Sequence, residues 1–158
     1  MSGAAPVFNV APKAGIKVAI ISASWHTDIC ASLVAGAVKA MDQYSVKYEI
    51  SYVPGAFELP LAAQKSLDAG FDAAVVVGLV MKGETPHFEY VCDGVTQGVM
   101  DVQLSRSKPI GFGVLMCTDI SQAIARTGGP GSKEDKGYDA GIAALALLSP
   151  PYGTAAHS

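Results

Sequence analysis

Three short runs of valine, isoleucine and other apolar residues, and a fourth that alternates polar with apolar residues, are separated by longer segments with helical spacing. This alternation is typical of an α/β sheet of mainly parallel strands covered by helices on both faces. We therefore predict strands at 17–22, 47–53, 73–81 and 109–117, and helices at 27–44, 54–70, 85–103, 119–127 and 133–148. Because ligands of such sheets bind beyond the carboxyl ends of the strands, the residues that follow each strand are the first candidates for function.

The size and the low charge of the chain constrain its organisation. Its 158 residues are enough for one domain, 1–158, with a substantial core. Only 16% of the residues are charged, below the roughly 25% of typical soluble domains, and burial of surface in an oligomer is one explanation. We interpret residues 1–15 as an N-terminal arm that could add an edge strand to this or another subunit, and 150–158 as a loose C-terminal tail.

Several classes of partner are disfavoured by composition. The net charge is −3 and basic residues do not cluster, which argues against nucleic acid. The longest apolar run, 73–81, is too short to cross a bilayer, and the first residues do not resemble a signal peptide, so we expect no membrane association. Three cysteines without a CxxC pair are typical of reduced core residues, and we expect a cytoplasmic protein.

The common motifs of cofactor and metal sites are missing from the sequence. It contains no GxxxxGK[ST] loop, and no GxGxxG follows the first strand, so P-loop and Rossmann nucleotide sites are unsupported. No HExxH or paired Cys/His spacing suggests a metal site, and no GxSxG elbow is present. What remains is a set of residues at the predicted strand ends.

His87 stands in "KGETPHFEY", directly after the third predicted strand. We expect Thr85 to be the N-cap and Pro86 the first residue of the following helix. The positive end of the helix dipole disfavours an imidazolium, which leaves the imidazole able to accept a proton as a general base. The alternative is a surface or capping histidine.

Arg126 and Lys136 flank the glycine loop "TGGPGS" as a phosphate clamp would. We expect Ser132 to cap the last helix, with Asp135 reaching back in a capping box. A lysine at the positive end of a helix makes sense where an anion docks. The alternatives are that Lys136 pairs with Glu134 or Asp135, and that Arg126 compensates the dipole of the preceding helix.

Trp25 and Glu58 follow the first and second predicted strands. Trp25 is the only tryptophan and lies outside any apolar stripe, so it could stack on a flat ring, or pack as a partly buried core aromatic. Glu58 lies in the apolar segment "GAFELPLAA" and could accept hydrogen bonds from ligand hydroxyls, or serve as an ordinary carboxylate at a helix start.

These features together resemble one known family. The segments "SASWHTDICASLVAGA", "VPGAFELPLAAQ", "VGLVMKGETPHFEYVCDGVTQGV", "GFGVLMCTD" and "QAIARTGG…EDKG" are similar to those of lumazine synthases and follow the family's order. The resemblance extends from about Lys17 to Leu148, and "PGAFELP" and "KGETPHFEYV" are its most specific parts.

The resemblance implies a fold, a reaction and an assembly. The fold is a flavodoxin-like three-layer α/β/α sandwich with a four-stranded parallel sheet. The enzyme condenses 5-amino-6-ribitylaminouracil with 3,4-dihydroxy-2-butanone 4-phosphate to 6,7-dimethyl-8-ribityllumazine plus phosphate and water, the penultimate step of riboflavin biosynthesis, without cofactor or metal. Members are homopentamers with sites at subunit interfaces, some form an icosahedral 60-mer, and a functional link to riboflavin synthase is implied. The loop "GGPGSKEDKG" is longer than in capsid-forming members, which favours a free pentamer.

The resemblance also assigns roles to single residues. His87 would shuttle protons during imine formation, phosphate loss and ring closure, and Trp25 would stack on the pyrimidine. The ribityl chain and the ring would be held by Ala56, Phe57, Glu58, Val80, Met81 and Phe112. The phosphate would be bound by Gly83, Glu84, Thr85, Arg126 and Lys136. In the family, the counterparts of Phe112, Arg126 and Lys136 come from the neighbouring subunit.

Two residues depart from the family pattern. Lys82 stands where arginine is usual, so a bidentate contact would be lost. Glu84 places a carboxylate in the phosphate-binding loop, whose backbone can still serve.

Three other functions are alternatives to the enzyme. A non-enzymatic flavin- or lumazine-binding protein would keep Trp25 and Glu58 but would not need His87, Arg126 and Lys136. A phospho-acceptor signalling domain would need acidic residues at the first and third strand ends, which here read Ser22-Ala-Ser and Lys82-Gly. A structural shell is an additional role that the sequence leaves open.

Overall fold

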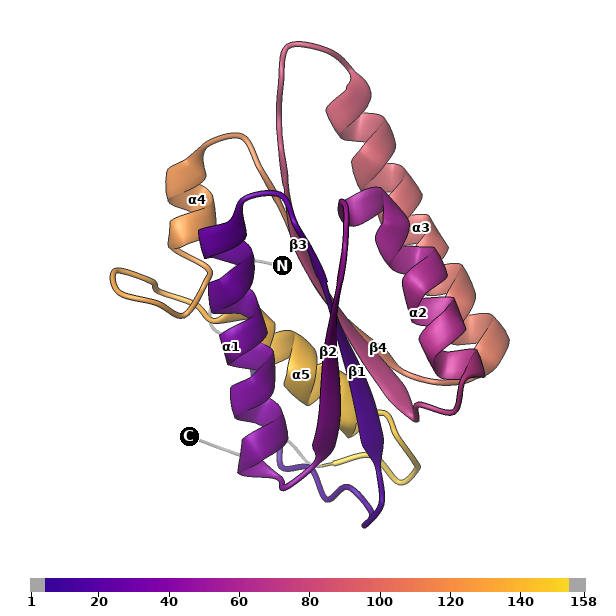
Figure 1. Cartoon of the computed structure of the whole chain (residues 1–158). Coiled ribbons are helices and arrows are strands. Elements are labelled where there is room, and N and C mark those ends of the chain that lie inside the picture. Colours follow the sequence, from indigo (N-terminus) through magenta and orange to yellow (C-terminus); the bar gives the residue numbers. More distant parts are fainter. Residues whose placement is uncertain (1–4, 154–158) are drawn as a thin grey trace.

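The computed structural model describes residues 5–153, whose centre is a parallel β-sheet (Figure 1). Its four strands, in the spatial order β2-β1-β3-β4, are β1 (Lys17–Ala23), β2 (Lys47–Val53), β3 (Ala73–Met81) and β4 (Ile110–Cys117). All neighbouring pairs are parallel, in register from Val18 opposite Ala73 and from Ala74 opposite Ile110. The predicted α/β fold is confirmed and fits the flavodoxin-like three-layer sandwich.

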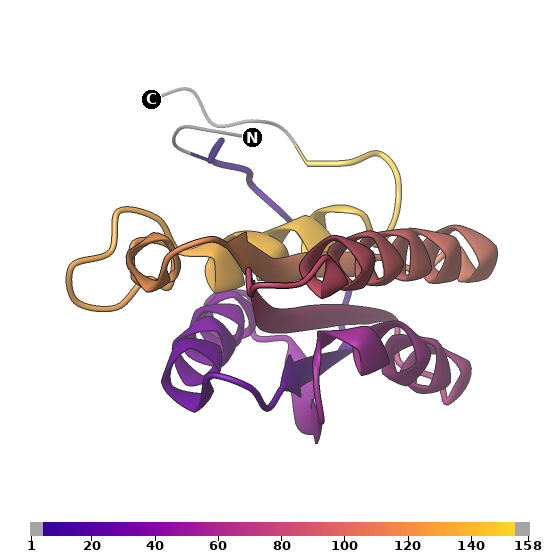
Figure 2. The same ribbon diagram turned by 90° about the horizontal axis from the view of Figure 1, so that it is seen from above.

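Helices cover both faces of the sheet. They are α1 (Thr27–Gln43), α2 (Leu59–Asp68), α3 (His87–Arg106), α4 (Ile120–Ile124) and α5 (Lys136–Ala146), and a 3₁₀ turn, η1 (Ala56–Glu58), precedes α2. Figure 1 shows α1 on one side of the sheet and α2 with α3 on the other. The view from above in Figure 2 shows the same separation, with the sheet between the helices.

Two hydrophobic clusters fill the space between the layers. One joins residues of α1 and α5 to the sheet, with Ile20, Leu33 and Met41 fully buried. The other joins α2 and α3 to the opposite face, around Ile21 and Val95. Every side chain of β3 from Ala73 to Leu79 that is not glycine is buried, as expected for a central strand covered on both faces.

Four predicted helix starts differ from the observed ones, that of α4 by a single residue, since it begins at Ile120 and not at 119. The predicted helix 54–70 begins as the 3₁₀ turn η1, and the regular helix α2 starts only at Leu59. The N-cap of α3 is Pro86 and the helix begins at His87, whereas Thr85 and Pro86 were expected in these places. The predicted Ser132 capping box is wrong: α5 begins at Lys136, and the Asp135 side chain caps it by accepting from the backbone N–H of Tyr138 at 3.0 Å.

The ends of the chain pack only in part. In residues 5–15 the structure contains no regular strand, although Val10 reaches the core cluster of α1 and α5. The predicted edge strand is therefore not formed within the described part of this chain. Of the predicted tail, 150–153 continue beyond α5 without helix, and 154–158 lie outside the described residues.

Candidate active site

The carboxyl end of β3 opens into a hollow of about 500 Å³ at the start of α3. It is lined by Lys82, Gly83, Glu84, Thr85, Pro86, Glu89, Tyr90 and Asp93. His87 lies beside it on the exposed first turn of α3, and its backbone N–H is 3.4 Å from Thr85 Oγ1. The predicted histidine and the predicted phosphate loop therefore lie together at the carboxyl edge of the sheet.

The predicted phosphate loop, Gly83 to Thr85, offers backbone donors to this hollow. Among the described residues, no acceptor is bound to the backbone N–H of Gly83, Glu84 or Thr85. Successive N–H groups just before a helix start, where the dipole is positive, favour an anion. This geometry suits a phosphate held by main-chain amides, and Glu84 itself lines the hollow.

Val80 and Met81 are the last residues of β3 and are half-buried. Strand β1 pairs with β3 only as far as Ser22 opposite Val77, whereas β4 follows β3 to Met81 opposite Cys117. On its β1 side the end of β3 is thus without a strand neighbour. Backbone groups there are available to a ligand, as the predicted role requires.

Trp25, Gly55 and Glu58 form a second part of the site, where β1 and β2 end. Trp25 is 70% exposed, and a Cβ placed on Gly55 would lie 3.4 Å from its Cδ1 atom. The backbone N–H of Gly55 donates to Glu58 Oε2 at 2.9 Å, so this carboxylate caps the 3₁₀ turn. Both interpretations of Glu58 fit this geometry, because the cap engages one carboxylate oxygen and leaves Oε1 for a ligand hydroxyl.

The turn that carries Trp25 is fixed by its neighbours. Ser24 donates from its backbone N–H to the Pro54 carbonyl at 3.2 Å and from Oγ to the Val53 carbonyl at 2.8 Å. His26, the N-cap of α1, has a left-handed backbone with φ 56°. The alternative of a partly buried Trp25 is wrong, since the indole projects outward from this fastened turn.

Ala56 and Phe57 lie between this turn and α3. Ala56 is buried, whereas the Phe57 ring is exposed and lies against Gly94, where an added Cβ would come within 2.8 Å of Phe57 Cε2. The absence of a side chain at Gly94 therefore lets the Phe57 ring come close to α3.

Arg126 and Lys136 are adjacent, but one carboxylate lies between them. An antiparallel bridge pairs Thr127 with Asp135, and Glu134 Oε2 lies 3.5 Å from Arg126 Nε. Its Oε1 atom lies 3.6 Å from Lys136 Nζ, so the alternative in which Lys136 pairs with Glu134 is confirmed. Lys136 Nζ is also 3.5 Å from Asp139 Oδ2, and burial raises the pKa of Asp139 although Lys136 opposes the shift.

A single chain does not bring this cation pair to the predicted phosphate loop. Neither Arg126 nor Lys136 lines the hollow beside His87, and Figures 1 and 2 show the loop after α4 at the side of the molecule away from the start of α3. Phe112 is also apart: it lies on the edge strand β4 and is 39% exposed.

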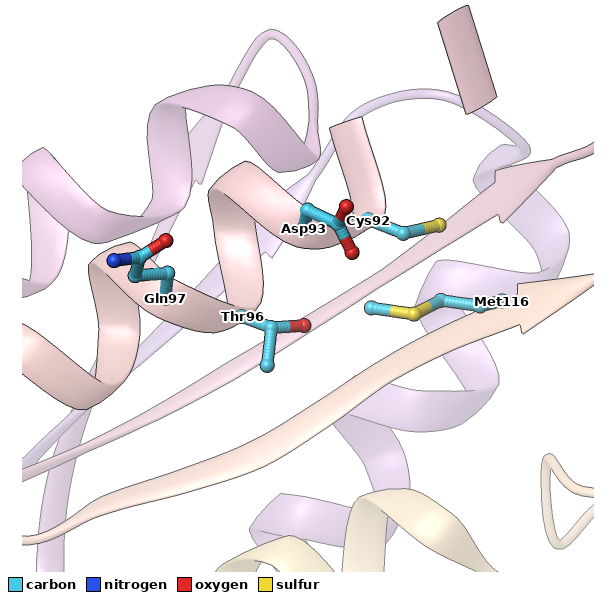
Figure 3. A pocket seen from close by; sticks show the side chains of 5 residues that line it. All are labelled: Cys92, Asp93, Thr96, Gln97 and Met116. Carbon is cyan, nitrogen blue, oxygen red and sulfur yellow. The ribbon is translucent and has the colours of Figure 1, made fainter. Parts of the chain in front are cut away.

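Sequence reasoning missed a smaller hollow between α3 and β4, of about 370 Å³. Figure 3 shows its lining residues Cys92, Asp93, Thr96, Gln97 and Met116. Burial raises the pKa of the Cys92 thiol, and Asp93 and Glu89 add to the shift. The spacing of Asp93 and Gln97 predicts that both lie on one face of a helix. Met116 lies on β4 and comes next to them only through the tertiary structure.

Two further observations concern the chain as a whole. In the described part, none of the helices has both the length and the apolar character needed to span a bilayer. The three cysteines, Cys30, Cys92 and Cys117, are buried and carry free thiols.

Comparison with known proteins identifies the family. A sequence model described as 6,7-dimethyl-8-ribityllumazine synthase matches residues 15–150. A protein of that name from Paenarthrobacter aurescens is 50% identical over 132 residues, 83% of this chain and 81% of the relative. One from Streptomyces coelicolor is 44% identical over 151 residues, 94% of either chain. The parallel sheet and the geometry at its strand ends agree with this match. The chain belongs to the 6,7-dimethyl-8-ribityllumazine synthase family.

Proposed function

We propose that this protein catalyses the condensation of 5-amino-6-ribitylaminouracil with 3,4-dihydroxy-2-butanone 4-phosphate to 6,7-dimethyl-8-ribityllumazine, phosphate and water. The observation that carries the proposal is the grouping of Trp25, Glu58, the Gly83–Thr85 loop and His87 at one edge of the sheet in a member of this family. Holding an amine and a carbonyl in attack geometry supplies much of the rate of such a condensation.

Each group has a separate task in the proposed reaction. Trp25 stacks on the pyrimidine, while Glu58, with the backbone of Ala56 and Phe57, holds the ribityl chain. Backbone groups of Val80 and Met81 fix the ring. His87 takes the proton from the attacking amine and returns protons as water and phosphate leave, a role that typically accounts for about 10²–10⁴-fold in rate.

The proposed phosphate site has two halves, and we assign them to two subunits. The amides of Gly83 and Glu84, with the amide and hydroxyl of Thr85, supply the first half. Arg126 and Lys136 of a neighbouring subunit, together with its Phe112, supply the second. The separation of these halves within one chain supports this assignment, as does the exposure of Phe112, Met116 and Tyr90.

The proposed assembly is a homopentamer, free rather than built into an icosahedral 60-mer. The long loop between Arg126 and Lys136 supports the free form, because the family resemblance associates capsid-forming members with a shorter loop. We further propose that the chain acts as one domain in the cytoplasm, which the free thiols support, and that its product passes to riboflavin synthase.

The direct test is to mix the purified protein with both substrates and follow the absorbance and fluorescence of the lumazine product. The His87→Ala variant serves as a comparison, and sedimentation measures the assembly of both proteins. A protein that binds the lumazine tightly but forms none from the substrates would instead be a binding protein on the same scaffold.

A further inference from the structure

We propose that Glu134 is an internal counter-ion of the Arg126–Lys136 pair, which the phosphoryl group of the substrate must displace. The inference rests on the proposed function in taking that pair as a phosphate site. The inference goes beyond the proposed function by assigning to Glu134 the control of how tightly phosphate is held and how readily the phosphate leaves.

The position of Glu134 is that of a bound anion. Its two carboxylate oxygens contact different cations, Oε2 at 3.5 Å from Arg126 Nε and Oε1 at 3.6 Å from Lys136 Nζ. Its side chain is only 20% exposed. A phosphate that bridged the same two cations would need the space that this carboxylate occupies.

The backbone around Glu134 holds the carboxylate at the pair. Its N–H donates to the Ala125 carbonyl at 3.0 Å, and its own carbonyl accepts from Gly128 at 2.9 Å. These bonds fasten the loop on both sides of the bridge between Thr127 and Asp135. The backbone of Glu134 is therefore fixed in place, and only its side-chain torsions need to change for an anion to enter.

Both cations keep other partners when Glu134 moves away. The Arg126 guanidinium donates from Nη1 to the Gln122 carbonyl at 2.7 Å, and Lys136 Nζ lies 3.5 Å from Asp139 Oδ2. The clamp can thus stay assembled while the carboxylate is exchanged for a phosphate.

The charges of the cluster explain why this exchange matters. Arg126 and Lys136 face two carboxylates, those of Glu134 and Asp139, so the closed cluster has no net charge. A neutral cluster attracts free phosphate weakly. Displacement of Glu134 leaves a net positive site for the bound phosphoryl group, and its return helps to expel the phosphate product.

The test is Glu134→Gln, which keeps the shape of the side chain and removes its charge, with inorganic phosphate as the probe. We expect the inhibition constant of phosphate against the phosphorylated substrate to fall on the order of tenfold, because a close negative charge is removed from a half-buried site. The KM for the phosphorylated substrate should fall as well, whereas the KM for the uracil substrate should not change.

Glu49→Gln is the matched control, because Glu49 also pairs with a lysine, Lys17, at 3.0 Å, but on the distant strands β1 and β2. It should leave phosphate inhibition unchanged. Glu134→Ala is a second variant, which should tighten phosphate binding in the same direction, and sedimentation verifies that each variant assembles.

A readout without catalysis separates this inference from the proposed function. Phosphate should raise the unfolding temperature of Glu134→Gln at lower concentrations than it does for the unaltered protein. If the protein formed no lumazine, this shift would still test the counter-ion. Weaker or unchanged phosphate binding in both Glu134 variants would overturn the inference and would indicate that Glu134 only positions the two cations or has no role.

Discussion

The backbone N–H of Lys136 donates a hydrogen bond of 2.9 Å to the carbonyl oxygen of Arg126, which fixes the two predicted phosphate ligands side by side. The bond belongs to the antiparallel stretch around the bridge of Thr127 with Asp135. The glycine loop between the two cations therefore closes on itself, and their charged ends meet at Glu134.

Loss of the guanidinium should affect one substrate selectively. We expect Arg126→Ala to raise the KM for the phosphorylated substrate roughly tenfold to a hundredfold, since a charge-assisted hydrogen bond contributes about 1.5–3 kcal/mol. The KM for the uracil should change little. Steady-state kinetics with each substrate varied in turn measures both constants.

Arg106→Ala is the control for the loss of an arginine, because Arg106 pairs with Asp68 at 3.1 Å at the far end of α3 from His87. It should leave both KM values unchanged. Equal increases in the two KM values of Arg126→Ala would contradict the phosphate clamp.

Removal of the imidazole should slow chemistry without disturbing structure. His87 is exposed at the first residue of α3, so His87→Ala removes no core contact. We expect kcat to fall by about 10²–10⁴-fold, the typical contribution of a positioned base. Single-turnover formation of lumazine measures the chemical step, and sedimentation measures the assembly.

Two outcomes of this experiment would contradict the proposed role of His87. An intact oligomer with unchanged kcat would remove His87 from the mechanism. Loss of assembly in His87→Ala would show that the histidine has a structural role at a subunit contact.

Local patterns predicted most of the fold, since buried parallel strands form uninterrupted apolar runs that stand out in a sequence. The bounds of β2 and β3 agree with the prediction, and β1 and β4 differ at one end only. Helix starts were less predictable. Ser132 looked like a cap, but the pairing of Thr127 with Asp135 leaves Asp135 to cap α5.

The site was predictable to the extent that it follows strand ends. The places of Trp25, Glu58 and His87 at one edge of the sheet follow from parallel topology alone. The position of Glu134 between Arg126 and Lys136 does not, because it depends on which residues face each other across a closed loop. The hollow at Cys92 was also not predictable, because it forms where α3 packs against β4, and only the tertiary structure brings these two elements together.

An aromatic ring at Trp25 should matter more than the indole itself. The side chain is exposed beside Gly55 and makes stacking surface available to the pyrimidine. We expect Trp25→Phe to bind the uracil nearly as well, and Trp25→Ala to bind it up to about tenfold more weakly, because aromatic stacking contributes about 0.5–1.5 kcal/mol. Fluorescence titration with the lumazine product in place of the uracil measures the same pocket.

Phosphate inhibition should be the same in both Trp25 variants, since the proposed role of the indole is in the ring site and not in the proposed phosphate site. If Trp25→Ala bound the ring compounds as tightly as the unaltered protein, stacking at this position would be excluded.

The pair of Asp68 with Arg106 should make stability depend on pH. Arg106 donates two hydrogen bonds to the Asp68 carboxylate, of 3.1 and 3.2 Å, and these bonds lower the pKa of Asp68 below its ordinary value of 3.8. A depressed folded-state pKa adds stability above the ordinary pKa, and this contribution is lost as the pH falls through the folded value.

We therefore expect Asp68→Asn to unfold at lower urea concentration than the unaltered protein at pH 7, with the difference disappearing in strong acid. Added salt should also reduce the difference, because the pair is exposed. A difference that stayed constant from neutral to acidic pH would attribute the loss to packing and not to charge.

Close contact between β4 and α5 should make Gly111 intolerant of any side chain. A Cβ at Gly111 would overlap the carbonyl oxygen of Ala140 in α5, which is backbone and cannot turn aside. Gly111→Ala must therefore push α5 away from the sheet, and we expect a loss of about 1–3 kcal/mol in the free energy of unfolding, the usual cost of overpacking. Urea titration measures this loss of stability.

Gly129→Ala is the control, because its added Cβ would meet only ordinary contacts, 3.7 Å from Thr127 Oγ1 and 3.8 Å from Ser32 Oγ, and stability should change by less than about 0.5 kcal/mol. Equal stability of the two variants would mean that α5 can move off β4 without cost, and the position of the loop that carries Arg126 and Lys136 would then not be fixed by this contact.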